Sequence, residues 1–209
     1  MGKNEQTDAG NNTLNNSLGT ISPVIFMILI FTAGCASLQA SLFMKDPLTA
    51  EEHNNLGVIY EREGKDDLAI REYESAVSID NTLVTPLVNL GNVYFKQGEF
   101  TKAEKSYKKA LELDESNLEA ANNLASLYIE IGEQYDQGLE YMLVATKNSE
   151  TIPPYALDTI GVLYLKLGNN SEAEKFLIEA CETVKDDEIL REEIRSNLWQ
   201  MGINKRCGD

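Results

Sequence analysis

The sequence predicts an all-α fold, a solenoid of four helix–turn–helix repeats followed by one capping helix. The first observation is internal repetition, because a shift of 34 residues brings much of the chain into register with itself. The second is a glycine after an apolar segment of helical length in every repeat, at Gly64, Gly98, Gly132 and Gly168, where a helix commonly ends. No segment carries the alternating pattern that would favour a β-strand instead.

The composition limits the classes of function. Among 209 residues, 18 lysines and arginines stand against 34 aspartates and glutamates, a formal net charge of -16. We therefore expect no nucleic-acid partner. One histidine and three cysteines leave little material for acid–base catalysis or a metal cage. The expectation is a non-enzymatic protein with no catalytic residue, no metal, no cofactor and no small-molecule substrate.

Residues 1–34 are predicted to be a lipoprotein signal peptide or a membrane anchor. No charge occurs between positions 9 and 44, and residues 21–32 are mostly apolar, as in a signal-peptide core. Residues 31–35, with the sequence FTAGC, resemble the bacterial lipoprotein box, although Thr32 stands where leucine is usual. The resemblance implies lipid attachment at Cys35 and a linker over residues 35–47. Because Ala36 follows, it also implies a bacterial cell-envelope address, at the outer membrane facing the periplasm.

A retained membrane helix is the alternative for the same region. Residues 24–44 are almost uninterrupted by polar side chains and are long enough to span a bilayer. Either interpretation attaches the protein to a membrane, through the lipidated Cys35 or through an N-terminal helix.

Four repeats follow, at residues 48–83, 84–117, 118–152 and 153–185. Eight residues of the first repeat return 34 positions later: Leu56, Gly57, Tyr60, Gly64, Ala69, Tyr73, Ala76 and Asp80 become Leu90, Gly91, Tyr94, Gly98, Ala103, Tyr107, Ala110 and Asp114. The third copy slips by one residue in its second half, to Gly138, Met142 and Ala145.

These residues resemble the tetratricopeptide repeat. The resemblance implies a right-handed superhelix whose first helices line a concave face. Small residues at Gly57, Gly91, Ala125 and Gly161 would let the second helix approach, and Tyr60, Tyr94, Tyr128 and Tyr164 would fill the space between repeats. Thr49 and Glu52 form a capping box at the first helix, and Pro153-Pro154 opens the fourth repeat.

The array is expected to close with a capping helix within residues 186–203. Ile189, Leu190, Ile194, Leu198 and Met201 recur at helical spacing and should face the last repeat, with Trp199 packed at the same seam. Cys181 and Cys207 leave two possibilities, a disulfide in an oxidising compartment or a buried Cys181 with a free thiol in the tail. We favour the second.

The concave face suggests a binding groove for a protein or peptide. Family knowledge assigns that face to particular places of each repeat, which here hold Asn54, Val58, Arg62, Val88, Asn92, Phe95, Lys96, Asn122, Ser126, Ile129, Tyr155, Asp158, Val162, Leu165 and Lys166. Apolar groups interleaved with amides suit an extended peptide or an amphipathic helix. Alternatively, Phe95 and Ile129 simply pack on the adjacent helix.

Two other polar residue types are expected to be structural. Asparagines recur at the sixth place of the first three repeats, where a local hydrogen bond to the backbone is the favoured interpretation. His53 lies at an inter-helix packing place, so it is expected to be structural as well.

The predicted function is a membrane-anchored periplasmic adaptor or scaffold, similar in plan to lipoproteins that pilot secretins or organise cell-wall enzymes. The alternatives are a non-catalytic subunit of a peptidase or export system, and a structural spacer whose groove binds nothing.

Overall fold

The computed structural model describes residues 46–207, which belong almost entirely to one of two compact units, Leu48–Asp209. The described residues contain helices and no strand. The helices are α2 (Ala50–Arg62), α3 (Asp66–Ile79), α4 (Val84–Lys96), α5 (Phe100–Leu113), α6 (Leu118–Ile131), α7 (Tyr135–Thr146), α8 (Pro154–Lys166), α9 (Asn170–Thr183) and α10 (Glu188–Gln200). The all-α prediction is therefore confirmed for this part of the chain.

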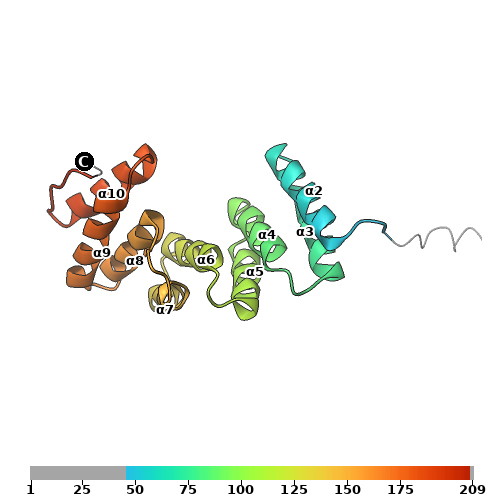
Figure 1. The fold of residues 1–209 in the computed structure, drawn as a ribbon, viewed down its shortest axis with the longest axis horizontal. Coiled ribbons are helices and arrows are strands. Elements are labelled where there is room, and N and C mark those ends of the chain that lie inside the picture. Colours follow the sequence, from blue (N-terminus) through green and yellow to red (C-terminus); the bar gives the residue numbers. More distant parts are fainter. Residues whose placement is uncertain (1–45, 208–209) are drawn as a thin grey trace, which may run out of the picture. The chain divides into compact units, whose positions relative to one another are not determined.

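The helices pair into four hairpins that follow one another along the unit (Figure 1). Each hairpin falls within one of the repeats expected from the sequence. The predicted glycines occur in the turns between paired helices: Gly64, Gly98, Gly132 and Gly168 have φ of 72°, 74°, 78° and 76°. An L side chain rarely adopts this left-handed conformation, which is why glycine recurs there.

The third hairpin has a different turn. Gly132 is itself the C-cap of α6, which has 14 residues, whereas α4 has 13 and its glycine comes one residue later. Gln134 then adopts a left-handed conformation, with φ of 56°. The one-residue slip seen in the sequence therefore arises at this turn.

Two helix starts form as predicted. The amide of Glu52 donates to Thr49 Oγ1 at 3.2 Å, and the amide of Thr49 donates to Glu52 Oε2 at 2.7 Å. The capping box therefore satisfies two amides that have no partner within the helix. Pro153 is the N-cap of α8 and Pro154 its first residue.

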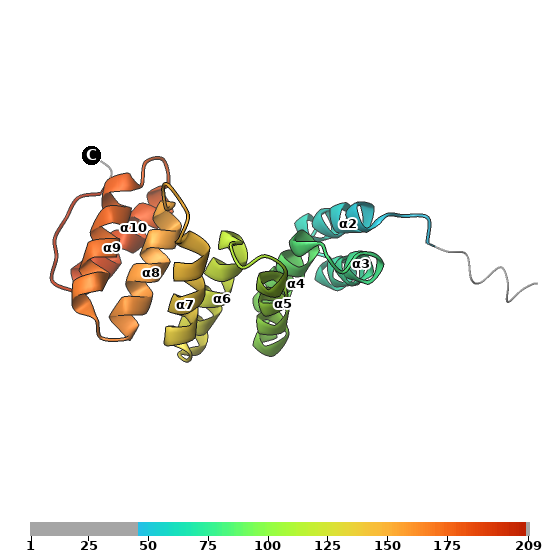
Figure 2. The same ribbon diagram turned by 60° about the horizontal axis from the view of Figure 1, so that its bottom comes forward.

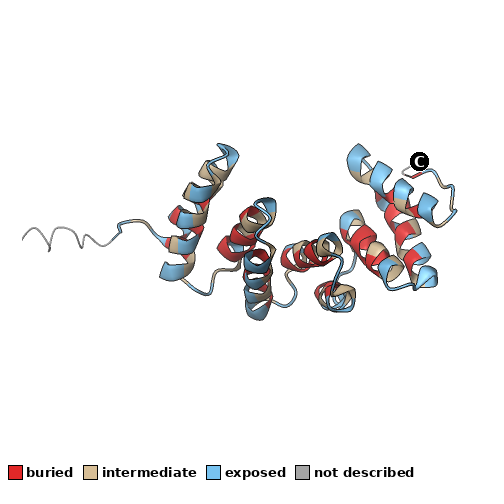
Figure 3. Ribbon diagram, turned by 180° about the vertical axis from the view of Figure 1, so that it is seen from behind, coloured by how far each residue is buried: buried red, intermediate tan, exposed pale blue. Residues whose placement is uncertain are grey.

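Small residues of the first helices face large residues of the second. A Cβ added to Gly91 would lie 2.4 Å from the ring of Tyr107, and one added to Gly57 would lie 2.5 Å from Tyr73. The buried residues, red in Figure 3, lie mostly on the sides of the helices that face a neighbouring helix. Within the first two hairpins, a glycine therefore makes room for a tyrosine ring, and the hairpins also contact their neighbours along the array.

The first helices form one face of the array (Figure 1 and Figure 2). Within the described part of the chain, α2, α4 and α6 each contact the first helix of the next hairpin and α8 contacts α10, whereas successive second helices, from α3 to α9, do not contact one another. Helices that lie closer together are on the inner side of a curve. We call the inner side the first-helix face and the opposite side the second-helix face.

The capping helix α10 lies against α8 and α9. Ile194 and Leu198 are fully buried, as predicted, but Ile189 and Trp199 are 84% and 74% exposed. The prediction that these two residues pack on the last repeat is wrong. They lie on sides of α10 that face away from α8 and α9, and no further helix of the described chain covers them.

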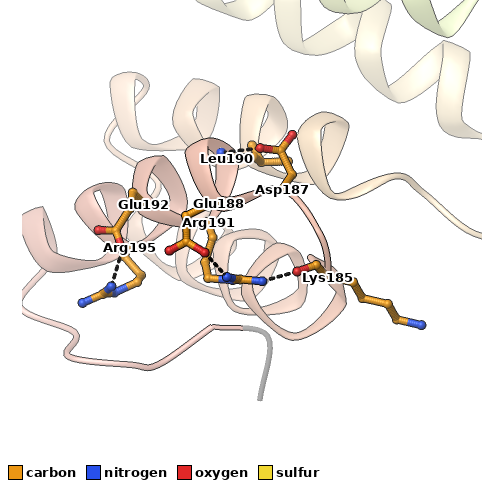
Figure 4. Close-up of polar contacts among 7 residues, drawn as sticks. All are labelled: Lys185, Asp187, Glu188, Leu190, Arg191, Glu192 and Arg195. Atoms are coloured by element: carbon orange, nitrogen blue, oxygen red, sulfur yellow. Dashed lines mark hydrogen bonds and ion pairs between the residues drawn. The ribbon is translucent and has the colours of Figure 1, made fainter.

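Polar contacts fix the entry to α10 (Figure 4). The side chain of Asp187 accepts the amide of Leu190 at 2.9 Å. The guanidinium of Arg191 bonds to both the carboxylate of Glu188 and the backbone carbonyl of Lys185. These bonds tie the helix to the loop that leaves α9.

The tail is joined to α9 by a disulfide between Cys181 and Cys207. The free-thiol interpretation is therefore wrong. The tail turns back after Gly202, whose φ is 79°, and Lys205 reaches Glu182 at 2.7 Å. This return brings Cys207 to the buried side of α9, a contact between residues 26 positions apart.

The predicted signal peptide, the lipid-attachment residue Cys35 and the alternative helix over residues 24–44 lie outside the described residues. Within residues 46–207, no helix combines the length and the hydropathy that crossing a bilayer requires.

Candidate functional site

The candidate binding surface is the first-helix face, because the predicted groove residues lie on α2, α4, α6 and α8. Four of them are exposed: Arg62, Lys96, Tyr155 and Lys166. Nine are half-buried: Asn54, Val58, Asn92, Phe95, Asn122, Ser126, Ile129, Val162 and Leu165. The remaining two, Val88 and Asp158, are buried, with 2% and 5% of their surface exposed. Neither of these two presents a side chain to a partner.

We call the contact between neighbouring hairpins, or between the last hairpin and α10, a seam. At each seam, one side-chain hydrogen bond joins two helices of the first-helix face: α2 and α4, α4 and α6, α6 and α8, or α8 and α10. Each donor lies in the later helix and each acceptor in the earlier one. The pairs are Asn89 to Asn54 at 3.0 Å, Asn123 to Asn92 at 2.8 Å, Thr159 to Asn122 at 2.9 Å and Asn197 to Asp158 at 3.0 Å. We call this series the seam ladder.

The seam ladder corrects the interpretation of the recurring asparagines. Asn89 and Asn123 donate to the preceding repeat, so the expected local bond to the backbone is wrong for both. Asn55, the equivalent residue of the first repeat, is exposed. An amide that is half-buried at a seam needs a partner, and the neighbouring helix supplies one.

A hollow of about 320 Å³ opens on the first-helix face beside α4 and α6. Its lining comprises Asn92, Phe95, Tyr107, Glu119, Asn123 and Ser126. Three of these are predicted groove residues, so the structure brings Asn92, Phe95 and Ser126 together in one place. Phe95 also packs on Phe100, with ring centroids 5.7 Å apart, so it both contacts the adjacent helix and lines the hollow.

Tyrosines of the second helices reach through to this face. The hydroxyl of Tyr107 donates to Asn92 Oδ1 at 2.8 Å, and that of Tyr73 donates to Glu61 Oε2 at 2.8 Å. Burial raises the pKa of the Tyr107 hydroxyl well above its usual range, so it remains a neutral donor. Gly91 makes room for the ring.

Tyr107 and Asn123 were not among the predicted groove residues. A signal for Tyr107 was present, because tyrosine recurs 34 residues apart at Tyr73 and Tyr107, each in the helix that follows a glycine at the eighth place. The position of Asn123 depends on how neighbouring repeats stack, which spacing within one repeat does not report.

The first-helix face ends where α10 covers Asp158. Burial raises the pKa of this carboxyl to about 7; hydrogen bonding from Asn197 opposes the rise, and the nearby charge of Glu193 adds to it. Asn197 takes the place that Asn89 and Asn123 hold at earlier seams. The capping helix therefore occupies the position of a further first helix.

His53 has the structural position expected of it. It is 3% exposed, and its Nδ1 lies 2.7 Å from Glu72 Oε2, which joins α2 to α3. Among residues 46–207, no group of histidine, cysteine or carboxylate side chains is arranged to hold a metal ion.

Solved structures share the fold. A tetratricopeptide repeat protein from Parabacteroides merdae is 25% identical, with a TM-score of 0.64, and the match covers 86% of this chain and 73% of that one. A structure of MamA is 24% identical, covering 75% and 86% of the two chains at a TM-score of 0.58. The pilF protein of Pseudomonas aeruginosa is 19% identical. The match covers 73% of this chain and 69% of that one, with a TM-score of 0.62. The last two likenesses concern the fold alone.

Family comparisons agree with the helix pattern. No curated protein matches the chain. Residues 86–117 and 155–185 match models of the tetratricopeptide repeat, and residues 62–98 match a further model described as a TPR repeat. The matched residues lie in α3, α4, α5, α8 and α9, and the four hairpins together form an all-α helical solenoid with the fold of tetratricopeptide repeat proteins.

Proposed function

We propose that this protein is a non-enzymatic adaptor that binds a segment of another protein on its first-helix face. The observation that carries the proposal is the hollow of about 320 Å³ beside Phe95. It combines an aromatic wall with polar groups, the mixture found where a few anchors supply most of the affinity.

The lining indicates how a segment would bind. An apolar side chain of the partner would enter beside Phe95, where it would leave water and contact the ring. Asn92 Oδ1 already accepts bonds from Tyr107 and Asn123, so it is held in place rather than available. Ser126 and the exposed Glu119 remain to meet N–H or O–H groups of the partner.

The proposed location is the bacterial cell envelope, with Cys35 lipidated and the repeats in the periplasm at the outer membrane. Two features support it: the FTAGC sequence at residues 31–35, and the disulfide between Cys181 and Cys207, a bond that persists mainly in oxidising compartments. Metabolic labelling with a clickable palmitate tests the anchor. We expect label in the wild type and none in Cys35→Ser; an unlabelled wild type contradicts the anchor.

Capture of partners from a crosslinked envelope tests the binding face. Phe95→Ala removes the aromatic wall, and Tyr155→Ala removes an exposed ring from the same face. Lys105→Ala, an exposed change on α5, is the matched control. We expect the double variant to lose a partner that the control retains. An unchanged partner list would instead support a structural spacer.

A further inference from the structure

A second groove lies on the second-helix face, between α5 and α7. It encloses about 440 Å³ and is lined by Lys108, Leu111, Glu112, Glu115, Gln137, Glu140, Tyr141 and Val144. Leu111, Tyr141 and Val144 form an apolar floor, and Glu112, Glu115 and Glu140 form an acidic rim. We call this the α5–α7 groove.

The other repeats show that α7 is unusual at these positions. Gly138 aligns with Ala69, Ala103 and Ala173, which sets the register of the second helices. In that register, the third repeat has Glu140 where each of the three other repeats has a cationic residue. The equivalents are Arg71, Lys105 and Lys175. Val144 replaces a polar or charged residue; the equivalents are Ser75, Lys109 and Glu179.

Packing within the array does not account for these replacements. The residues with which α7 enters the core are Gly138, Met142, Ala145 and Thr146. Tyr141 packs against the edge of that core, whereas Val144 and Glu140 take no part in it. Val144 is 39% exposed, and Tyr141 is half-buried. Apolar surface left in water gives no stability to the isolated chain, whereas it would do so under a bound segment.

The charge around the floor is negative. The ammonium of Lys108 lies 2.7 Å from Glu104 Oε1, so a carboxylate outside the groove already engages the one lining cation. Three lining carboxylates remain, and Glu112, Glu115 and Glu140 are all exposed. A partner with positive charge beside an apolar stripe would match both features.

We propose that the α5–α7 groove binds a basic amphipathic helix of a partner protein. The groove is built from helices, whose backbone groups are already bonded internally. An extended segment would find no strand edge to pair with, whereas a helix satisfies its own backbone bonds and offers its side chains. From Gln137 to Val144 the floor runs for about 10 Å, two turns of helix.

This proposal does not depend on binding at the first-helix face. The two surfaces lie on opposite sides of the array, so both can be occupied at once. A protein with both would join two partners, one recognised on the first helices and the other by its basic helix.

Fluorescence anisotropy on the purified full chain tests the groove. The probe is a short labelled peptide of leucine and lysine placed at helical spacing. Glu112→Lys with Glu140→Lys reverses the charge of most of the rim, and Val144→Lys places a positive charge in the floor. We expect each change to raise Kd by about tenfold or more. An unchanged Kd in both would overturn the proposal.

Two controls separate this site from general attraction to an acidic chain. Glu174→Lys with Glu179→Lys makes the same change in net charge at exposed positions of α9 and should leave Kd within about twofold. Equal weakening by this pair would overturn the proposal. Phe95→Ala should also leave Kd unchanged, and a loss there would place the probe on the first-helix face instead. Thermal melts identify any variant that does not fold.

Discussion

The seam between the second and third repeats and the seam between α8 and α10 use the same contact with different chemistry. At the first, Asn123 donates to Asn92 at 2.8 Å; at the second, Asn197 donates to Asp158 at 3.0 Å. The interior pair is neutral and borders an open hollow. The terminal pair contains a carboxyl that is 5% exposed, and the disulfide holds the neighbouring tail.

The comparison shows how the array ends. A single helix occupies the position of a further repeat and makes the contact of the seam ladder, but it also covers the first-helix face at Asp158. The interior seams therefore keep a surface available to a partner, while the terminal seam closes it. The stability of the terminal seam is then expected to depend on oxidation and on the titration of Asp158, whereas the Asn123–Asn92 pair of the interior seam contains neither a disulfide nor a titrating group.

Loss of the disulfide should have the largest effect and should be confined to the terminal seam. Cys181→Ser with Cys207→Ser should destabilise α10 by about 3 kcal/mol, because the tail is no longer held to α9. Hydrogen exchange, followed region by region, should show faster exchange in residues 184–203 and little change in α4 and α6. Equal acceleration in α4 would show that the two seams are not independent.

Filling the space at Gly91 should have the next largest effect, at the interior. The added methyl of Gly91→Ala would meet the buried ring of Tyr107 and should cost about 2 kcal/mol of unfolding free energy. The third repeat has Ala125 and Met142 at the equivalent places. Gly91→Ala with Tyr107→Met should therefore recover part of the loss in urea melts. If stability were not recovered, this would contradict the explanation that Gly91 is small because it makes room for the ring of Tyr107.

The terminal seam should weaken as the pH rises. Burial raises the pKa of Asp158 from 3.8 to about 7, so between these values the folded chain holds a proton that the unfolded chain releases. The stabilisation is complete below pH 4 and is lost as the pH rises through 7. Between about pH 5.5 and pH 8 the loss should be about 2 kcal/mol, because each pKa unit corresponds to about 1.4 kcal/mol.

The comparison with Asp158→Asn isolates this effect from other titrations. The variant keeps a group that accepts from Asn197 and carries no charge. The difference in melting temperature between variant and wild type should grow in favour of the variant from pH 5 to pH 8. A constant difference would show that Asp158 is not the titrating group.

The smallest effect should come from the interior pair. Asn123→Ala removes the donor to Asn92, and Asn92 keeps its bond from Tyr107. We expect a loss of about 1 kcal/mol, the same at pH 5 and pH 8, in urea titrations. A loss that changes with pH would remove the distinction between the seams.

The features that the sequence predicted are those decided within one repeat. Gly64 ends its helix through its own backbone conformation, and the Thr49–Glu52 box joins residues three positions apart. Local chemistry repeated at a fixed spacing was sufficient for the hairpins, for their order and for part of the hollow, including Phe95.

The features that were missed are decided between distant parts of the chain. The partner of Asn89 lies 35 residues away, and that of Cys207 lies 26 away. The exposure of Trp199 depends on whether another helix follows α10 in space. Helical spacing showed that α10 has an apolar side, but which of its apolar residues are covered depends on the stacking geometry.

Photo-crosslinking at Ser126 tests the central claim, that stacked repeats leave an open face for a polypeptide. In one variant, a benzophenone amino acid replaces Ser126, which lines the hollow. In the control variant, it replaces Glu174, which is exposed on α9. In cells of the native organism, the account predicts a covalent protein adduct from Ser126 and none of the same mass from Glu174. No adduct at Ser126, or the same adduct from both positions, would contradict it.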